Sequence, residues 1–155
     1  MGLMVPLVVT KESAILVDDT WPILLMKAAG VNVPMGISFV DAERIAAFLK
    51  DGTLEPGSFV NIIKYLLAEC GTSVTKVAIT EISDNEFISQ IFLREGDGGE
   101  EVALPALPGE AILLALILGA PMFIDEQVVI EATAGEYAQG LIAALEQTDP
   151  SVLES

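Results

Sequence analysis

The segment formed by residues 102–126 constrains the fold more than any other part of the chain. It reads VALPALPGEAILLALILGAPMFIDE, which we interpret as a strand, two prolines, a short helix and a second short strand. The helix stops at Gly119, and Pro121 follows it. Glu110 is its single carboxylate, and the helix otherwise lacks a polar face. Because such a helix must be buried on all sides, the sequence predicts a domain built around it.

The length and composition indicate one compact domain. A chain of 155 residues fits a single domain, which we assign to residues 1–147, with residues 148–155 as a frayed C-terminal tail. The apolar content of 52% and the mean hydropathy of +0.60 suggest apolar surface between subunits. No apolar run reaches the 18–20 residues or so of a membrane span, and the N-terminus lacks the features of a signal peptide. We therefore expect no membrane partner. The single cysteine rules out an intramolecular disulfide and fits a reducing compartment, so we expect a cytoplasmic protein.

The charge of the chain limits its chemistry. It carries 23 acidic and 7 basic residues, a formal net charge of −16, and no histidine. The basic residues are scattered singly, so the charge disfavours binding to a nucleic-acid backbone. Without histidine the usual general base and the commonest transition-metal ligand are absent. Catalysis would therefore depend on carboxylates, hydroxyls, amines or a hard metal ion held by oxygen atoms.

Three amphipathic helices are predicted besides the buried one. The first covers residues 40–49, with Ser38 as its N-cap, and ends at Gly52. The last covers about residues 135–146. The second carries a continuous apolar stripe and is capped by Ser58; the stripe consists of Phe59, Ile62, Ile63, Leu66, Leu67 and Cys70. Because Cys70 lies on this stripe and no histidine can activate it, we expect a buried structural thiol.

The remaining periodic segments predict an α+β fold with a mixed or antiparallel sheet and packed helices. A hairpin turn is expected at residues 83–85 and a looser turn at residues 96–99. Both faces of the strand between them are largely apolar, which favours a subunit partner on one face. Residues 33–49 and 102–118 share a weakly similar order of strand, proline and helix, which suggests an internal β–α duplication. Strands are predicted over residues 5–10, 21–28, 33–37, 74–82, 87–94, 101–104 and 122–124.

Three carboxylates are candidates for chemistry, namely Asp41, Glu43 and Glu110. Each lies near the start of a predicted helix, where an acidic residue complements the positive end of the helix dipole. The same residues could instead act as a general base or as metal ligands. Asp18 and Asp19 similarly could bind a hard cation or form a solvated turn. The sequence leaves these alternatives open.

The order of these elements and three local motifs resemble the bifunctional nuclease domain family over about residues 5–129. Residues 40–45 (VDAERI) correspond to a family helix start of the form Phe-Glu-Ala-x-x-Ile. Residues 54–59 (LEPGSF) occupy the position of an Arg-Pro-Thr-His-Asp-type lead into the second helix. Residues 105–116 and 119–122 correspond to Asp-Ala-Arg-Pro-Ser-Asp-Ala-Ile-Ala-Leu-Ala-Leu followed by Gly-Ala-Pro-Ile.

The resemblance implies an α+β domain that forms a homodimer and has non-specific DNase and RNase activity. Such metal-assisted phosphodiester hydrolysis would use Mg²⁺ or Mn²⁺ held by carboxylates. Asp41, Glu43 and Glu110 are then the candidates for the catalytic groups, because they are the acidic residues at the matching positions.

This chain also departs from the family pattern at its polar positions. Pro105, Leu107 and Gly109 stand where the family has Asp, Arg and Ser, and the lead into the second helix lacks the arginine and histidine. These departures, together with the charge of −16, support an alternative function. That alternative is a catalytically degenerate, dimeric scaffold or regulatory protein of the same fold.

Overall fold

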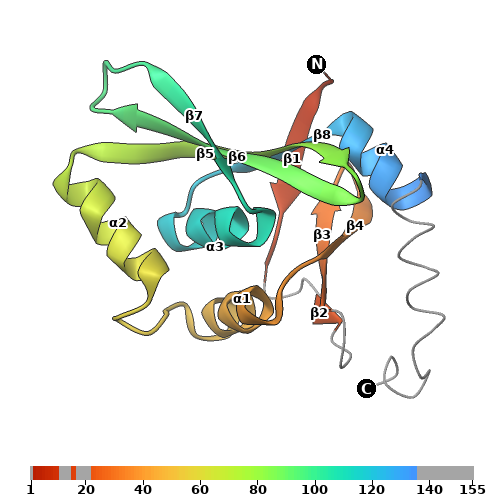
Figure 1. The fold of residues 1–155 in the computed structure, drawn as a ribbon, viewed down its shortest axis with the longest axis horizontal. Helices are drawn as coiled ribbons and strands as arrows, with labels where there is room; N and C mark the ends of the chain where they lie inside the picture. Colours follow the sequence, from red (N-terminus) through yellow and green to blue (C-terminus); the bar gives the residue numbers. More distant parts are fainter. Residues whose placement is uncertain (1, 11–14, 17–21, 136–155) are drawn as a thin grey trace.

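A computed structural model of the chain confirms the predicted α+β class (Figure 1). The structure describes residues 2–10, 15–16 and 22–135. Within these ranges it contains four helices and eight strands. Their bounds in chain order are β1 (Met4–Val8), β2 (Ile15–Leu16), β3 (Ile23–Ala28), β4 (Val31–Gly36), α1 (Phe39–Asp51), α2 (Phe59–Glu69), β5 (Thr72–Ser83), β6 (Glu86–Glu95), β7 (Glu101–Ala106), α3 (Pro108–Leu118), β8 (Met122–Asp125) and α4 (Glu126–Ala134).

The strands form one mixed sheet, as predicted. Their order is β2-β3-β1-β8-β5-β6-β7, and β4 pairs with β3 beside this path. β5 and β8 run parallel, whereas the other strand pairs of the described residues are antiparallel. The chain travels from β5 to β8 through β6, β7 and α3, because parallel neighbours need a long crossover. This connection lays α3 across one face of the sheet (Figure 1).

The turn between the long strands β5 and β6 has the geometry that its residues favour. Asp84 and Asn85 both adopt positive φ angles, 52° and 65°. A two-residue hairpin turn of this kind matches the twist of the flanking strands, and Asp and Asn tolerate it. The looser turn at residues 96–99 joins β6 to β7. Both turns confirm the sequence prediction.

α1 and α2 begin at the predicted N-caps. The Ser38 hydroxyl accepts a hydrogen bond from the Asp41 N–H at 3.1 Å. The Ser58 hydroxyl accepts one from the Asn61 N–H at 3.4 Å. Each bond satisfies a backbone donor that a helix start leaves unpaired. α1 ends at Gly52, whose φ of 74° is the left-handed conformation in which glycine is favoured.

α3 is the buried helix that residues 102–126 predict. It begins at Pro108 and ends at Gly119, which has a φ of 68°. Residues 111–115 are all buried, and the helix contacts α1, α2, β5 and β6. Figure 1 shows α3 beneath the sheet, on the side that also carries α1 and α2. The largest apolar core of the described residues includes its Ile112 and Leu113.

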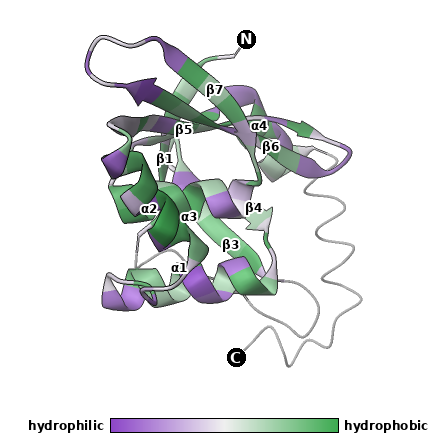
Figure 2. Cartoon of the chain, turned by 60° about the vertical axis from the view of Figure 1, so that its left-hand side comes forward, coloured by the Kyte–Doolittle hydropathy of each residue, from purple (hydrophilic) through white to green (hydrophobic). Residues whose placement is uncertain are grey.

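The apolar stripe of α2 faces outward. Val60 is the buried residue of this helix, whereas Phe59 and Leu66 remain 75% and 58% exposed. Cys70 is also exposed, so the prediction of a buried structural thiol is wrong. The reason is that α2 packs on α3 and β5 with the side that contains Val60 and the half-buried Leu67, whereas the rest of the stripe is exposed. Figure 2 shows α2 at the outside of the molecule.

α4 has no counterpart among the predicted elements. Its N-cap is the buried Asp125, whose carboxylate accepts hydrogen bonds from the Gln127 N–H at 2.8 Å and the Gly2 N–H at 3.1 Å. Residues 128–130 are all β-branched, which favours a strand, and the helix was therefore not predicted from the sequence. A capping aspartate followed by Glu126 is the signal that could have revealed it.

Several predictions are not confirmed or lie outside the described residues. The internal duplication is not confirmed. The helix predicted over residues 135–146, the tail and Asp18-Asp19 lie outside the described residues, apart from Gly135, which follows α4. The single domain over residues 1–147 stays a prediction. Among the described residues, no helix is long and apolar enough to cross a membrane.

Candidate functional site

Asp41 lies where α1 meets the start of α3. It belongs to the first turn of α1 and is half-buried. Its carboxylate packs against the backbone of Gly109, the second residue of α3. A Cβ atom built on Gly109 would lie only 3.0 Å from the Asp41 Cγ and would collide with Oδ2. Asp41 therefore occupies space that any side chain at position 109 would need, and it lies beside the positive end of α3.

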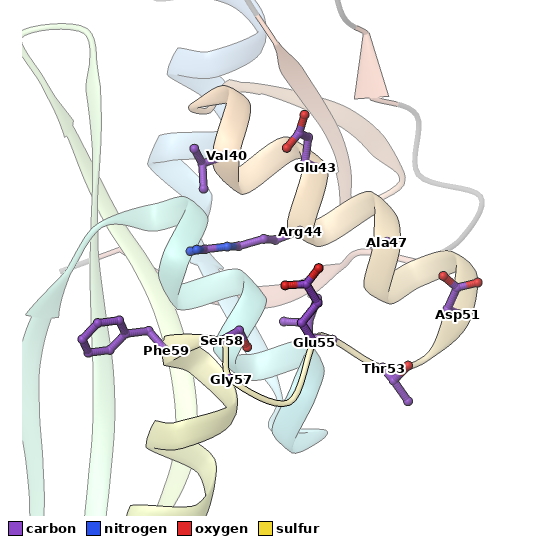
Figure 3. A pocket seen from close by; sticks show the side chains of 11 residues that line it. Val40, Glu43, Arg44, Ala47, Asp51, Thr53, Glu55, Gly57, Ser58 and Phe59 are labelled. Carbon is purple, nitrogen blue, oxygen red and sulfur yellow. The ribbon is translucent and has the colours of Figure 1, made fainter.

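Glu43 lines a cleft of about 980 Å³ between α1 and the beginning of α2 (Figure 3). Asp51 and Glu55 contribute two further carboxylates to the same cleft. The loop that forms its floor is fixed by Asn61, whose side-chain amide donates to the carbonyls of Leu54 (3.2 Å) and Glu55 (2.9 Å). These two hydrogen bonds hold the α1–α2 connection in the conformation that forms the cleft.

Arg44 supplies the cation of this cleft. Figure 3 shows its side chain extending from α1 across the cleft, with Glu55 beneath it and Glu43 directed away. Arg44 takes part in neither of the two ion pairs found within the described residues. A guanidinium with donors to spare can bind an anionic group such as a phosphate, whereas the three carboxylates of the cleft oppose such a ligand.

Glu110 is exposed in the first turn of α3. The N-cap of that helix, Leu107, has no side chain that can accept a hydrogen bond from the first turn. A carboxylate at Glu110 therefore complements the dipole of a helix that has no other polar residue at its start. Glu110 lines neither the α1–α2 cleft nor the second hollow described below.

A second hollow of about 550 Å³ is more apolar. It lies between the start of α1, the β5–β6 turn and the start of α3, and Phe39, Phe87 and Leu107 line it. Glu86 is its one carboxylate. None of the three candidate carboxylates lines this hollow, so Glu86 does not share a site with any of them.

The structure thus separates the three predicted residues. Asp41 lies beside the α3 backbone, Glu43 lies at the edge of the α1–α2 cleft, and Glu110 is exposed on α3. In the part of the chain that the structure describes, no group of three His, Cys, Asp or Glu side chains could hold a metal ion. A helix turns about 100° per residue, so the two-residue spacing of Asp41 and Glu43 already directs them to different sides of α1.

The strongest electrostatic cluster lies elsewhere, on the sheet face away from α3. Glu101 accepts a hydrogen bond from the Thr75 hydroxyl at 2.7 Å and pairs with Lys76 at 3.5 Å and Arg94 at 3.7 Å. The Thr75 hydrogen bond is the main cause that lowers the pKa of Glu101 from its ordinary value of 4.5, partial burial opposes it, and Lys76 and Arg94 lower it further.

This cluster was missed in the sequence because its members come from three strands. Pairing of Arg94 with Glu101 across β6 and β7 places them side by side. Lys76 also lies over the Phe92 ring, 4.6 Å from its centre. The apolar surface of this sheet face is thereby partly covered by a side chain of the same molecule.

Comparison with known proteins gives one family and two relatives. The sequence model of the bifunctional nuclease domain matches residues 23–136. Uncharacterized proteins of two Mycobacterium tuberculosis strains, CDC 1551 / Oshkosh and ATCC 25618 / H37Rv, are each 24% identical over 113 residues. This match spans 72% of the present chain and 66%, slightly under two thirds, of each relative.

Proposed function

This chain belongs to the bifunctional nuclease domain family, and from that premise we propose that it acts as a dimeric scaffold or regulatory protein of the nuclease fold. The observation that carries the proposal is the separation of Asp41, Glu43 and Glu110 into three environments. Hydrolysis of a phosphodiester needs groups that converge on one phosphate. Asp41, Glu43 and Glu110 do not converge in this way.

The residues present do not fit the divalent cation that the family implies. Within the described residues no three-ligand group exists, and the family positions held here by Pro105, Leu107 and Gly109 have lost their polar side chains. The net charge of −16 adds long-range repulsion of a polyanionic substrate. We therefore assign no step to a metal ion.

The second candidate function is the phosphodiester hydrolysis credited to the family. One observation favours it, namely the α1–α2 cleft in which Arg44 lies among Glu43, Asp51 and Glu55. A phosphate would be recognised there by the guanidinium. This function would place the reaction at Glu43 and away from Glu110.

A digestion assay separates the two functions. Plasmid DNA and single-stranded RNA are incubated with the purified chain in Mg²⁺ or Mn²⁺, beside the Glu43→Gln, Glu110→Gln and Arg44→Ala variants. We expect no cleavage above that of a mock purification. Cleavage that disappears in Glu43→Gln or Arg44→Ala would establish the nuclease function at the cleft. Cleavage that disappears in Glu110→Gln would place it at α3, and either result would overturn the scaffold proposal.

A further inference from the structure

α2 exposes an apolar face, which we call the α2 face, made of Phe59, Ile62, Ile63, Tyr65 and Leu66. Their exposed fractions are 75%, 42%, 36%, 65% and 58%. The N-cap of this helix is satisfied, and Val60 is its buried residue. The face is therefore a formed helical surface that the described part of the chain leaves exposed.

The area of the α2 face matches what a standard dimer buries. If a fully exposed side chain of this size presents about 200 Å², the five residues together present roughly 550 Å². A standard interface buries about 800 Å² on each partner, of which a little over half is apolar. The apolar share is thus about 450 Å² per partner, an area that the α2 face alone can supply.

The charge of α2 permits a second copy of this chain as its occupant. Two copies that each carry −16 repel one another over most of their surfaces. α2 holds one basic and one acidic residue, Lys64 and Glu69, so its formal charge is zero. Because salt screens exposed charges beyond about 8 Å, the repulsion at a contact depends on the local charge, and α2 as a whole adds no net charge to it.

The outer face of the sheet is a weaker alternative for self-association. Lys76 covers Phe92 there, and the Glu101 cluster places three charged groups on that face. Docking a copy on it would require the desolvation of these charges.

We propose that two copies pack their α2 faces against each other across a two-fold axis. The inference rests on the dimer of the proposed function and assigns its surface. The contact is isologous, so each residue of the α2 face is used twice. Leu66 and Phe59 lie at the centre of the helical stripe and are its anchors.

The test is sedimentation equilibrium of the full chain with Leu66→Glu and Phe59→Glu. We expect the wild type to be a dimer and each variant to raise the dimer dissociation constant about 100-fold or more, because symmetry places the change on both sides of the contact. Ile130→Glu is the matched control, since Ile130 is 50% exposed on α4. It should leave the dimer intact. Circular dichroism confirms that each variant is folded.

The single exposed cysteine gives a second readout. Cys70 follows α2 and belongs to the same stripe, so the dimer should slow its reaction with a thiol reagent and Leu66→Glu should restore a fast reaction. A monomeric wild type, or a Leu66→Glu dimer with unchanged Cys70 protection, would overturn the inference. A cleaved substrate in the digestion assay would refute the scaffold function while leaving this interface intact, so the two failures are distinguishable.

Discussion

Replacing Gly109 by alanine should destabilise the domain even though alanine is the better helix former. Gly109 is buried in the first turn of α3. A Cβ atom there would lie 3.0 Å from the Asp41 Cγ and 3.1 Å from the Asp41 Cβ. Because the Asp41 Cβ itself takes part, a rotation of the carboxylate relieves only part of the contact, and α1 must shift. Overpacking of this kind costs about 1–3 kcal/mol, and helix propensity offsets up to about 1 kcal/mol. The expected net loss is about 1–2 kcal/mol.

The effect of Gly109→Ala on the free energy of unfolding should change sign when Asp41 is shortened. In an Asp41→Ala background the carboxylate is gone, so Gly109→Ala should be neutral or stabilising by up to about 1 kcal/mol. Asp41→Asn is the matched control, since it removes the charge and keeps the size. There Gly109→Ala should remain destabilising, which separates the steric cause from the electrostatic one.

Urea and thermal unfolding of the three single and two double variants measure this coupling. For a chain of 155 residues, a loss of 1–2 kcal/mol lowers Tm by about 2–8 °C. Protein concentration must be held constant, because a dimer makes Tm depend on it. The reasoning is refuted if Gly109→Ala is as stable as the wild type, or if it costs the same in the wild-type and Asp41→Ala backgrounds.

Two further predictions concern the sheet. Ser89→Ala should lower the free energy of unfolding by about 1–2 kcal/mol, because the buried Ser89 hydroxyl donates to the Ala106 carbonyl across β6 and β7; urea unfolding beside a Ser→Ala change at an exposed position measures it. Thr75→Val should raise the pKa of Glu101 toward 4.5, as an NMR titration of that carboxyl would report. A carboxyl whose pKa is lowered by folding stabilises the folded state above its unfolded pKa, and this stabilisation is lost as the pH falls through the folded pKa. Thr75→Val should therefore lose less stability than the wild type when the pH is lowered from about 5.

The elements that could be predicted from the sequence are those whose signals are local. Ser38 and Ser58 act on backbone donors three residues away, and the Asp84-Asn85 turn depends on its own φ angles. The strands, the caps of α1 and α2 and the buried α3 follow from such signals. α4 was missed because the β-branched residues 128–130 give a competing local signal.

The placement of the candidate residues could not be predicted, because it depends on contacts between distant segments. The contact between Asp41 and Gly109 joins positions 68 residues apart. The Glu101 cluster requires the register of β5, β6 and β7. Periodicity alone could have separated Asp41 from Glu43, since two residues turn a helix by roughly 200°.

α2 and α3 explain how a chain can be both unusually apolar and strongly acidic. α3 is apolar all round and lies in the core, whereas the α2 face is apolar and exposed. The carboxylates avoid both helices except at Glu69 and Glu110. Charge is kept off one exposed helix, and Pro105, Leu107 and Gly109 stand where the family motif has polar residues. The same distribution of side chains thus argues for self-association and against hydrolysis.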